Sequence, residues 1–565
     1  MVFAAALRLP RLVAGSAGRT VLLGLFRSPL YRWRFARAGP ERLVLAPQDL
    51  RAPDPIRAAE IVEGRFTLAG KTVDTGEASP FTVRAPSQAW QDALFGFTWL
   101  RHLGAAPNGT TRAMARQLVA DFLQSAVRYS PPALEPVVTS RRLQAWLSQA
   151  PMVLEGADRA FNRAFLRSLN WQCRYLLQVG PKGRDGLPHL LCAVAVMQAS
   201  LCLSNRGALR RCALRWLARE LSRQVLPDGC HVSRNPQALI ELLLDLLPLR
   251  QSFAASNLVP PPEVLGAIDR MMPMLRFFRH TDGALAAFNG MGYTQAHLLT
   301  KLLLYEETRG RPMRSAPHGG YQRIEAAGAV LLVDAGRPPP AAMAQEAHAG
   351  ALAFEFSADQ TRIVVNCGSP GAGREVWRDL ARQTAAHSTA VVASISSASF
   401  APQALQTGLI GRPIVAGPTK LTANREEGPD ETRLELRHDG YRPRFRLMHR
   451  RSLSLSARDG ALRGSDQFER PDGRPWRGSQ PVVVRFHIHP AVKVVPGSGP
   501  NEIRLLLPNG RSWLFSSGDV VPTIEESVHF ANPEGPRRCT QITLSLPSPR
   551  SAAKTSLSWS IEPGS

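Results

Sequence analysis

Three polar side chains that could act together lie between residues 347 and 389. The segments ALAFEF and RIVV are typical of neighbouring β-strands, separated by the turn-like SADQT. This hairpin places His348 and His387 at its two ends and Asn366 between them, so the three side chains could converge. Two imidazoles and an amide can hold a ligand, or they can simply hydrogen-bond inside a sheet, and the residue types leave both interpretations open.

A second polar motif, QVLPDGCHVSRNPQALIELLLDLL, spans residues 224–247 and places a loop before a helix. The loop holds His231, Ser233, Arg234 and Asn235. A guanidinium fork suits a carboxylate, so Arg234 is a candidate ligand for an acidic group, although it could instead brace the loop. Asn235 or Ser233 is equally suited to cap the following helix.

These motifs resemble the signature of the heparinase II/III family of polysaccharide lyases. In that family a HxHADxLSFEL segment precedes a VDPGT-like strand and an xAHNT element, which AHAGALAFEF, VNCGSP and AAHST match here. The family element QxxPDGGHxERSPxYHxxxLxxLLDL matches the second motif. The resemblance runs from about residue 56 to residue 547 and covers most of the chain.

The resemblance implies a polysaccharide lyase that acts on a uronic-acid glycan by β-elimination, in a cleft between two domains. Such an enzyme must neutralise the uronate carboxylate, remove the proton alpha to it and protonate the leaving oxygen. In this family an Asn or an acid group handles the carboxylate, and Tyr and His residues move the protons. Some members also hold one zinc ion through two His and one Asp.

Several of the family's functional positions carry other residues in this sequence. The family's SNH element falls on residues 187–189, so the carboxylate-binding Asn corresponds to Pro188, and the His is kept as His189. The catalytic Tyr corresponds to Ala238, and the first His of HxH to Glu346. Three groups that usually bind the carboxylate or transfer protons are therefore missing by this alignment.

The zinc position is also altered. The three metal ligands of the family correspond to His348, Asn366 and His387. Two imidazoles are strong zinc ligands, whereas a neutral amide in place of the Asp is a weak one. The sequence therefore predicts at most one zinc ion at these residues and no other cofactor.

Two functions fit these departures. The first is a polysaccharide lyase with a rearranged site, in which the candidate catalytic residues are His231, Arg234, Glu346, His189 and Tyr293. The candidate substrate-binding residues are Arg234, Asn235 and Arg382. By default, Tyr293 is an ordinary aromatic at a helix start. The second function is that of a degenerate member that binds an anionic glycan, or serves in the cell envelope, without cleaving anything.

The charge of the chain agrees with an anionic partner. The 565 residues include 69 basic and 45 acidic ones, a net charge of +24. Nearly all of the excess is arginine, which a high-GC coding bias also explains. The basic residues are dispersed and no recognised nucleic-acid motif is present, so nucleic acid is not the expected partner. The seven cysteines are odd in number and mostly lie in apolar helical sequence, as buried thiols do.

The elements that must position these residues fall into three parts. Residues 1–50 form a basic extension, either poorly ordered or an amphipathic arm on a membrane surface. Residues 51–312 carry helical patterns at spacings of about 20 to 30 residues, which an incomplete α/α toroid satisfies. Residues 313–565 alternate in short runs typical of an antiparallel β-sandwich of stacked sheets. In it we expect an Asn-Gly hairpin at LPNGRSW and an exposed sheet edge at FHIHP.

The predicted fold class is therefore α+β and multidomain. Family resemblance places the protein in the periplasm or cell envelope. A cleavable signal peptide is doubtful because arginine interrupts the short apolar runs of the N-terminus, so the cytoplasm is the alternative. No stretch of 18 apolar residues exists. Nothing in the sequence fixes an oligomeric state.

Overall fold

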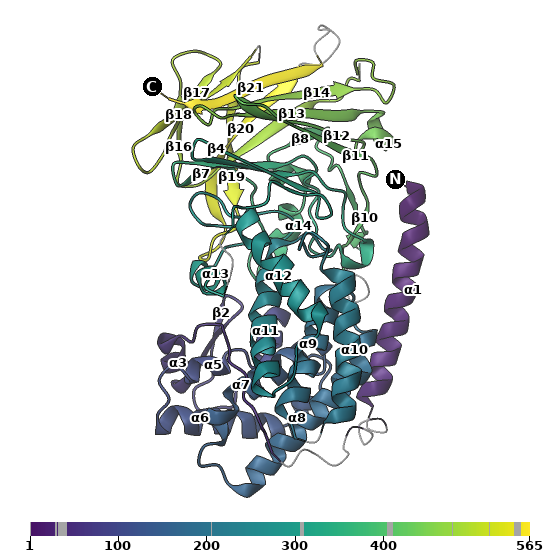
Figure 1. The fold of residues 1–565 in the computed structure, drawn as a ribbon, viewed down its shortest axis with the longest axis vertical. Helices are drawn as coiled ribbons and strands as arrows, with labels where there is room; N and C mark the ends of the chain where they lie inside the picture. Colours follow the sequence, from purple (N-terminus) through teal and green to yellow (C-terminus); the bar gives the residue numbers. More distant parts are fainter. Residues whose placement is uncertain are drawn as a thin grey trace.

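The computed structural model describes residues 2–28, 31, 35, 42–204, 206–305, 310–403, 411–476, 478–518, 520–546 and 555–564. Figure 1 shows a helical body that carries a body of stacked β-sheets at one end. The predicted order of a toroid followed by a sandwich is confirmed. Within the described residues, no helix is long and apolar enough to cross a bilayer.

The helical body is built from antiparallel helices joined by short loops. They are α3 (Pro55–Val62), α4 (Gln88–Gly96), α5 (Leu100–Leu103), α6 (Gly109–Gln124), α7 (Pro136–Leu154), α8 (Arg159–Val179), α9 (Leu187–Cys202), α10 (Gly207–Gln224), α11 (Pro236–Ala255), α12 (Pro262–Phe277) and α13 (Ala296–Leu303). A small hairpin of β1 (Arg65–Leu68) and β2 (Lys71–Asp74) precedes α4.

Helix patterning explains which helices lie inside. In α9 every residue from 189 to 202 is buried, and α11 is buried along most of its length. Helices that are apolar all round belong in the interior of a helical body. The aromatic residues of the helix near residue 90, including Trp90, Phe97 and Trp99, are each at most 2% exposed and belong to the core.

In the described part of the chain, two large antiparallel sheets make up most of the β body, beside a two-stranded sheet of β9 (Ser399–Phe400) and β10 (Ile414–Ala416). The nine-stranded sheet contains β3 (Ser315–Ala316), β4 (Tyr321–Ala326), β5 (Ala329–Asp334), β6 (Phe354–Ala358), β7 (Thr361–Val365), β8 (Ala390–Val392), β15 (Val482–Ile488), β19 (Thr523–His529) and β20 (Arg537–Leu546). The eight-stranded sheet contains β11 (Leu421–Glu427), β12 (Glu431–His438), β13 (Met448–Ser456), β14 (Leu462–Glu469), β16 (Lys493–Pro496), β17 (Glu502–Leu506), β18 (Ser512–Ser517) and β21 (Ser556–Pro563).

Large side chains from both sheets fill the space between them. Phe354 of one sheet stacks on Trp559 of the other, with ring centroids 5.4 Å apart. The predicted Asn-Gly hairpin is confirmed, since Gly510 adopts a φ of 83° in the turn between β17 and β18. The expected exposed edge at FHIHP is wrong. Strand β15 lies inside its sheet, paired with β20, β7 and β8, and His487 is only 2% exposed.

Part of the basic N-terminal extension is helical. Residues Val2–Arg27 form helix α1, which runs along the outside of the molecule past the junction of the two bodies (Figure 1). Near its C-terminus, Leu23 and Phe26 join the core of the helical body. Nearer its start, Leu12 and Val13 pack against residues in and beside the short strand β10 (Ile414–Ala416).

Buried polar contacts hold the two bodies together. His280, after α12, contacts the carboxylate of Glu355 on β6 at 2.9 Å, and the same carboxylate accepts the backbone N–H of Ala287 at 3.1 Å. Asn289 donates to Asp334 at the end of β5 at 3.0 Å. Since these groups are nearly fully buried, separating the bodies would expose or orphan all of them.

Candidate functional site

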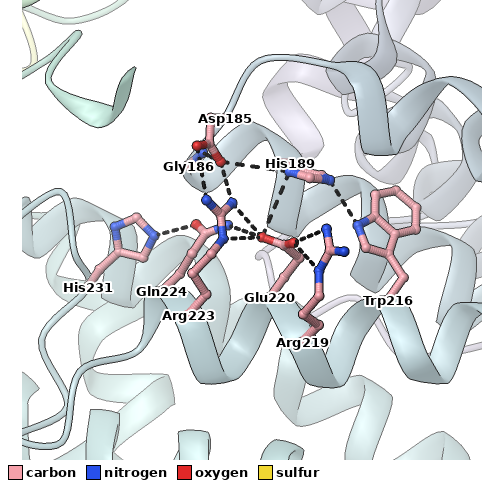
Figure 2. Close-up of polar contacts among 9 residues, drawn as sticks. All are labelled: Asp185, Gly186, His189, Trp216, Arg219, Glu220, Arg223, Gln224 and His231. Atoms are coloured by element: carbon pink, nitrogen blue, oxygen red, sulfur yellow. Dashed lines mark hydrogen bonds and ion pairs between the residues drawn. The ribbon is translucent and has the colours of Figure 1, made fainter. Parts of the chain in front are cut away.

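A polar network joins the first turn of α9 to the last turns of α10 (Figure 2). His189 lies in the first turn of α9, where its Nε2 accepts a hydrogen bond from the indole N–H of Trp216 at 2.9 Å. The ring proton is therefore on Nδ1, which lies 3.8 Å from oxygens of both Asp185 and Glu220. His189 is 6% exposed, so it faces protein groups and not solvent.

The two acids of this network are neutralised by arginine. Arg223 donates to Asp185 Oδ2 at 3.0 Å and to Glu220 Oε2 at 2.6 Å, and Arg219 contacts Glu220 at 3.1 Å (Figure 2). Burial opposes ionisation of Glu220, but hydrogen bonds from Gln224 and Arg223 outweigh it and lower its pKa.

In the described part of the chain, one group of acidic and histidine side chains is close enough together to hold a metal ion. The ligand atoms of Asp185, His189 and Glu220 all lie within 4.8 Å of one another. The guanidinium of Arg223 already holds both carboxylates. A cation here would have to displace that charge, so the donor set is only weakly suited to a metal.

His231 is held at the other end of the same network. Its Nδ1 contacts the Ser233 hydroxyl at 2.7 Å, and its Nε2 contacts Gln224 Oε1 at 3.0 Å. Gln224 donates in turn to Glu220, which fixes the amide orientation and places the ring proton on Nε2. Burial lowers the pKa of His231 to about 4. Both ring nitrogens are engaged by protein, and neither is left for a substrate.

Arg234 takes the bracing role. Its guanidinium pairs with Asp334 at 2.5 Å and donates to the carbonyls of Gly319 at 2.7 Å and Gly320 at 3.1 Å. It also lies over the ring of Tyr321, 4.6 Å from the centroid. These contacts tie the loop of the second motif to the β body. These contacts use the guanidinium N–H groups of Arg234 that the sequence assigns to a substrate carboxylate.

The two other predicted substrate ligands also have structural contacts. Asn235 caps α11, because its Oδ1 accepts the backbone N–H of Gln237 at 2.9 Å. Arg382 is 2% exposed and donates to the carbonyls of Ala347 and Arg412 at 2.9 and 2.7 Å. Burial lowers the pKa of Arg382 to about 10.

The predicted convergence in the first motif is only partial. His348 Nδ1 and His387 Nε2 are 3.0 Å apart, and His387 Nδ1 donates to the Gln383 carbonyl at 2.8 Å. The amide of Asn366 is engaged elsewhere, donating to Glu355 at 3.1 Å and accepting from the Ser388 N–H at 3.0 Å. Burial lowers the pKa of both imidazoles.

These residues do not fit the family's zinc site. Zinc in proteins usually has at least three protein ligands. Here two ring nitrogens already face each other, and the third position offers a neutral amide whose oxygen holds a backbone N–H. We therefore assign no metal-dependent chemistry to these three residues.

Glu346 and Tyr293 remain accessible. The Glu346 side chain is 47% exposed and lies 3.9 Å from Arg378. Tyr293 is 47% exposed and lines a cavity of about 800 Å³ beside α11. In the same wall, Gln295 and His297 are also exposed.

This cavity, which we call the α11 cavity, contains one arginine without a carboxylate partner. Arg51 and Arg141 both pair with Asp245, at 2.9 and 2.8 Å. In contrast, among the described residues Arg101 hydrogen-bonds only to the Thr98 carbonyl, and its Nε has no hydrogen-bond partner. Across the described chain, no carboxylate lies within 4.0 Å of the Arg101 guanidinium. Burial lowers its pKa, and the more distant Asp49 and Glu241 only partly oppose that shift.

Sequence reasoning missed Arg101 and His297. Arg101 follows an aromatic helix that the sequence correctly assigns to the core. A polar residue next to such a helix gives no separate signal of a functional role. Tyr293 and Gln295 alternate in the extended segment before α13, and His297 lies in the first turn of that helix, so no single periodicity links the three.

A second cavity, of about 1040 Å³, lies between the two bodies, where the sequence predicts the binding cleft. We call it the interdomain cavity. Arg337 and Arg442 are exposed on its wall, with no carboxylate within 4.0 Å in the described part of the chain. Its acid, Asp439, accepts hydrogen bonds from Thr419 and Lys420. The family's catalytic positions, at Pro188, Ala238 and Glu346, do not line it.

Comparison with known proteins supports the resemblance. The family model "Heparinase II/III-like, C-terminal" matches residues 308–560. The FtsZ-localized protein C of Caulobacter vibrioides is 30% identical over 516 residues, which cover 89% of this chain and 88% of that protein.

Solved structures share the fold. A crystal structure of heparinase III matches with a TM-score of 0.70 at 12% identity, over 96% of this chain and 89% of that one. A mutant of the heparan sulfate lyase HepC from Pedobacter heparinus matches with a TM-score of 0.62 at 15% identity, over 97% and 88%. With the matching family model and a relative of this identity and coverage, the chain belongs to the heparinase II/III-like family.

Proposed function

We propose that this protein binds an anionic, uronic-acid-containing glycan in the interdomain cavity and does not cleave it by the family's usual mechanism. The observation that carries the proposal is the replacement of the family's carboxylate-binding and proton-transfer groups. Pro188, Ala238 and Glu346 stand where the family has Asn, Tyr and His, and the ring nitrogens of His189 and His231 are engaged by protein.

The interdomain cavity supports the binding part of the proposal. Arg337 and Arg442 present guanidinium groups on two segments of its wall, each free of an acidic partner in the described chain. Guanidinium forks bind carboxylates and sulfates through paired hydrogen bonds. The proline-rich segment at residues 338–340 gives this wall a restricted backbone, which reduces the ordering cost of binding.

Titration calorimetry with heparin and polygalacturonate tests the binding. We expect Arg337→Ala and Arg442→Ala each to weaken binding by about tenfold. Arg504→Ala is the matched control, since Arg504 is an exposed arginine on β17. Equal loss in all three variants would mean that net charge, and not this cavity, binds the glycan.

A rearranged lyase is the second candidate, and the α11 cavity favours it. Arg101 could neutralise a carboxylate there, while Tyr293 and His297 are exposed groups able to move protons. Elimination leaves a conjugated double bond in the uronate, so ultraviolet absorbance during incubation with the same glycans detects it directly. A rise that Tyr293→Phe abolishes would establish the lyase. A flat trace with intact binding supports the first proposal.

We also propose a place in the cell envelope, at sites that contain FtsZ. The name of the Caulobacter relative states that it is localised with FtsZ, and that relative matches nearly the whole chain. A fluorescent fusion imaged together with labelled FtsZ tests this. Uniform fluorescence through the cytoplasm would contradict it.

A further inference from the structure

A groove of about 850 Å³ lies between α6 and α8. Figure 1 shows both helices toward the end of the helical body that is farthest from the sheets. We call it the α6/α8 groove. It is separate from both cavities considered above, with which it shares no lining residue. Glycan binding in the interdomain cavity therefore assigns no role to the α6/α8 groove.

One face of α6 presents small and polar side chains to the groove. It presents Ala113, Gln117, Ala120 and Gln124, which recur every three or four residues and so lie along one face of the helix. The alanines leave room for a close approach. The exposed glutamine amides offer both hydrogen-bond donors and acceptors.

The floor and the α8 wall are aromatic. Phe161 and Trp171 of α8 line the groove with Tyr129, and all three rings are partly exposed. Tyr129 and Trp171 pack edge to face, with centroids 5.8 Å apart. Ala164, which lies between the two α8 aromatics in the sequence, contributes only a methyl group to the lining. Such a surface suits apolar side chains of a partner.

The charges of the groove are nearly all positive. Arg116, Arg128 and Arg167 line it, and in the described part of the chain none has a carboxylate within 4.0 Å. Its lining contains one acid, Asp158, whose Oδ1 caps α8 by accepting the Phe161 N–H at 2.7 Å. The groove therefore attracts anions.

A fourth arginine lies beneath the floor. Arg142 is 1% exposed and donates to Gln172 Oε1 at 3.0 Å and to the Phe95 and Ala133 carbonyls at 2.9 and 3.0 Å. All of these acceptors are neutral, and burial lowers its pKa to about 9. Buried cations usually have an acidic partner. A carboxylate bound in the groove would supply the missing charge.

We propose that the α6/α8 groove binds an acidic peptide segment of a partner protein, with its apolar side chains on the aromatic floor and its carboxylates toward the arginines. The glutamine amides favour a peptide, because a peptide backbone can hydrogen-bond to them and a lipid acyl chain cannot. The aromatic floor disfavours a glycan that is charged on every sugar.

Fluorescence anisotropy of the full chain with a labelled peptide of alternating Glu and Leu tests the proposal. We expect saturable binding that a Lys-Leu peptide does not show. Arg128→Glu and Arg167→Glu should each weaken it by at least about tenfold, since each replaces an attraction by a repulsion. Ala164→Trp, which fills the groove, should weaken it without changing any charge.

Arg504→Glu on β17 is the matched charge control and should leave the affinity unchanged. Circular dichroism melting confirms that each variant is folded. Equal binding of both peptides, or equal losses in the groove and control variants, would overturn the proposal. Binding to phosphatidylglycerol vesicles that Ala164→Trp abolishes, without peptide binding, would overturn it in favour of a membrane surface.

Discussion

At the residue scale, several polar side chains that the sequence offers as site residues make buried contacts within the chain. Arg234 shows this most clearly, because a fork suited to a carboxylate instead pairs with Asp334 of the same chain. Asp334 is 3% exposed. The pair joins residues that are 100 positions apart, so it was invisible to motif reasoning.

We expect Asp334→Asn to destabilise the protein strongly. The variant would leave the buried Arg234 charge with only neutral partners, a loss of about 3–5 kcal/mol. Urea unfolding measures it. Glu346→Gln, at a side chain that is 47% exposed, is the control and should stay within about 0.5 kcal/mol of the parent. A change below about 1 kcal/mol in Asp334→Asn would contradict the bracing role.

A chelator should leave the protein unchanged. His348 and His387 already hydrogen-bond to each other, and Asn366 is held by Glu355 and Ser388. We therefore expect the same melting temperature with EDTA and with added zinc. A melting temperature that falls in EDTA, recovers with zinc and does neither in His387→Ala would show that a metal binds there.

At the element scale, the cap of α11 is the sharpest test of the second motif. Asn235→Ala removes the acceptor for the Gln237 N–H and should cost about 1 kcal/mol. Asn235→Asp keeps an acceptor at that position and should restore most of the stability in urea unfolding. Loss of glycan affinity in Asn235→Asp, without loss of stability, would instead support the substrate-binding role predicted from sequence.

Elements were easier to predict than the site. Periodicity located α9, α11 and most strands, because apolar spacing directly reflects burial. Periodicity gave the wrong position for the strand that contains His487, which lies inside a sheet and not at its edge. The His487 ring contacts Ser527 at 2.8 Å and the Ala385 carbonyl at 3.0 Å. Periodicity also could not show which arginines lack a carboxylate partner, as Arg101 does. Such pairs join residues that are far apart in the sequence.

Helix α1 should contribute to the stability of the whole chain. Val13→Asp would place a charge where Leu12 and Val13 pack against Ala401 and Val415. We expect a loss of about 1–3 kcal/mol and faster proteolysis near the helix. Val21→Asp, at a residue of the same helix that is 66% exposed, is the matched control. Equal behaviour of the two variants would mean that the contact contributes nothing.

At the scale of the whole molecule, buried neutral histidines make stability depend on pH. Burial lowers the pKa of His231 to about 4 and that of His487 to about 3, from an ordinary value near 6.5. Below pH 6.5 the unfolded chain binds protons that the folded chain does not, so acid favours unfolding. His348, His438 and His449 act in the same direction.

We expect the free energy of unfolding to fall steadily as the pH drops from about 6.5 to 4, by several kcal/mol in total. Urea titrations at a series of pH values measure it. His231→Gln should flatten the dependence, because it removes one of the groups. Constant stability across this range would show that these imidazoles are charged in the folded protein.

The contact of α1 with the β body sets an order for synthesis. Leu12 and Val13 pack against Val415, about 400 residues later in the chain. The helix therefore leaves the ribosome long before its partner strand exists, while domains usually fold in order of synthesis. Leu12 and Val13 must therefore stay without this contact through most of translation, whereas Leu23 and Phe26 can pack on the helical body earlier. The N-terminal half of α1 is thus among the last parts of the molecule to reach its final contacts.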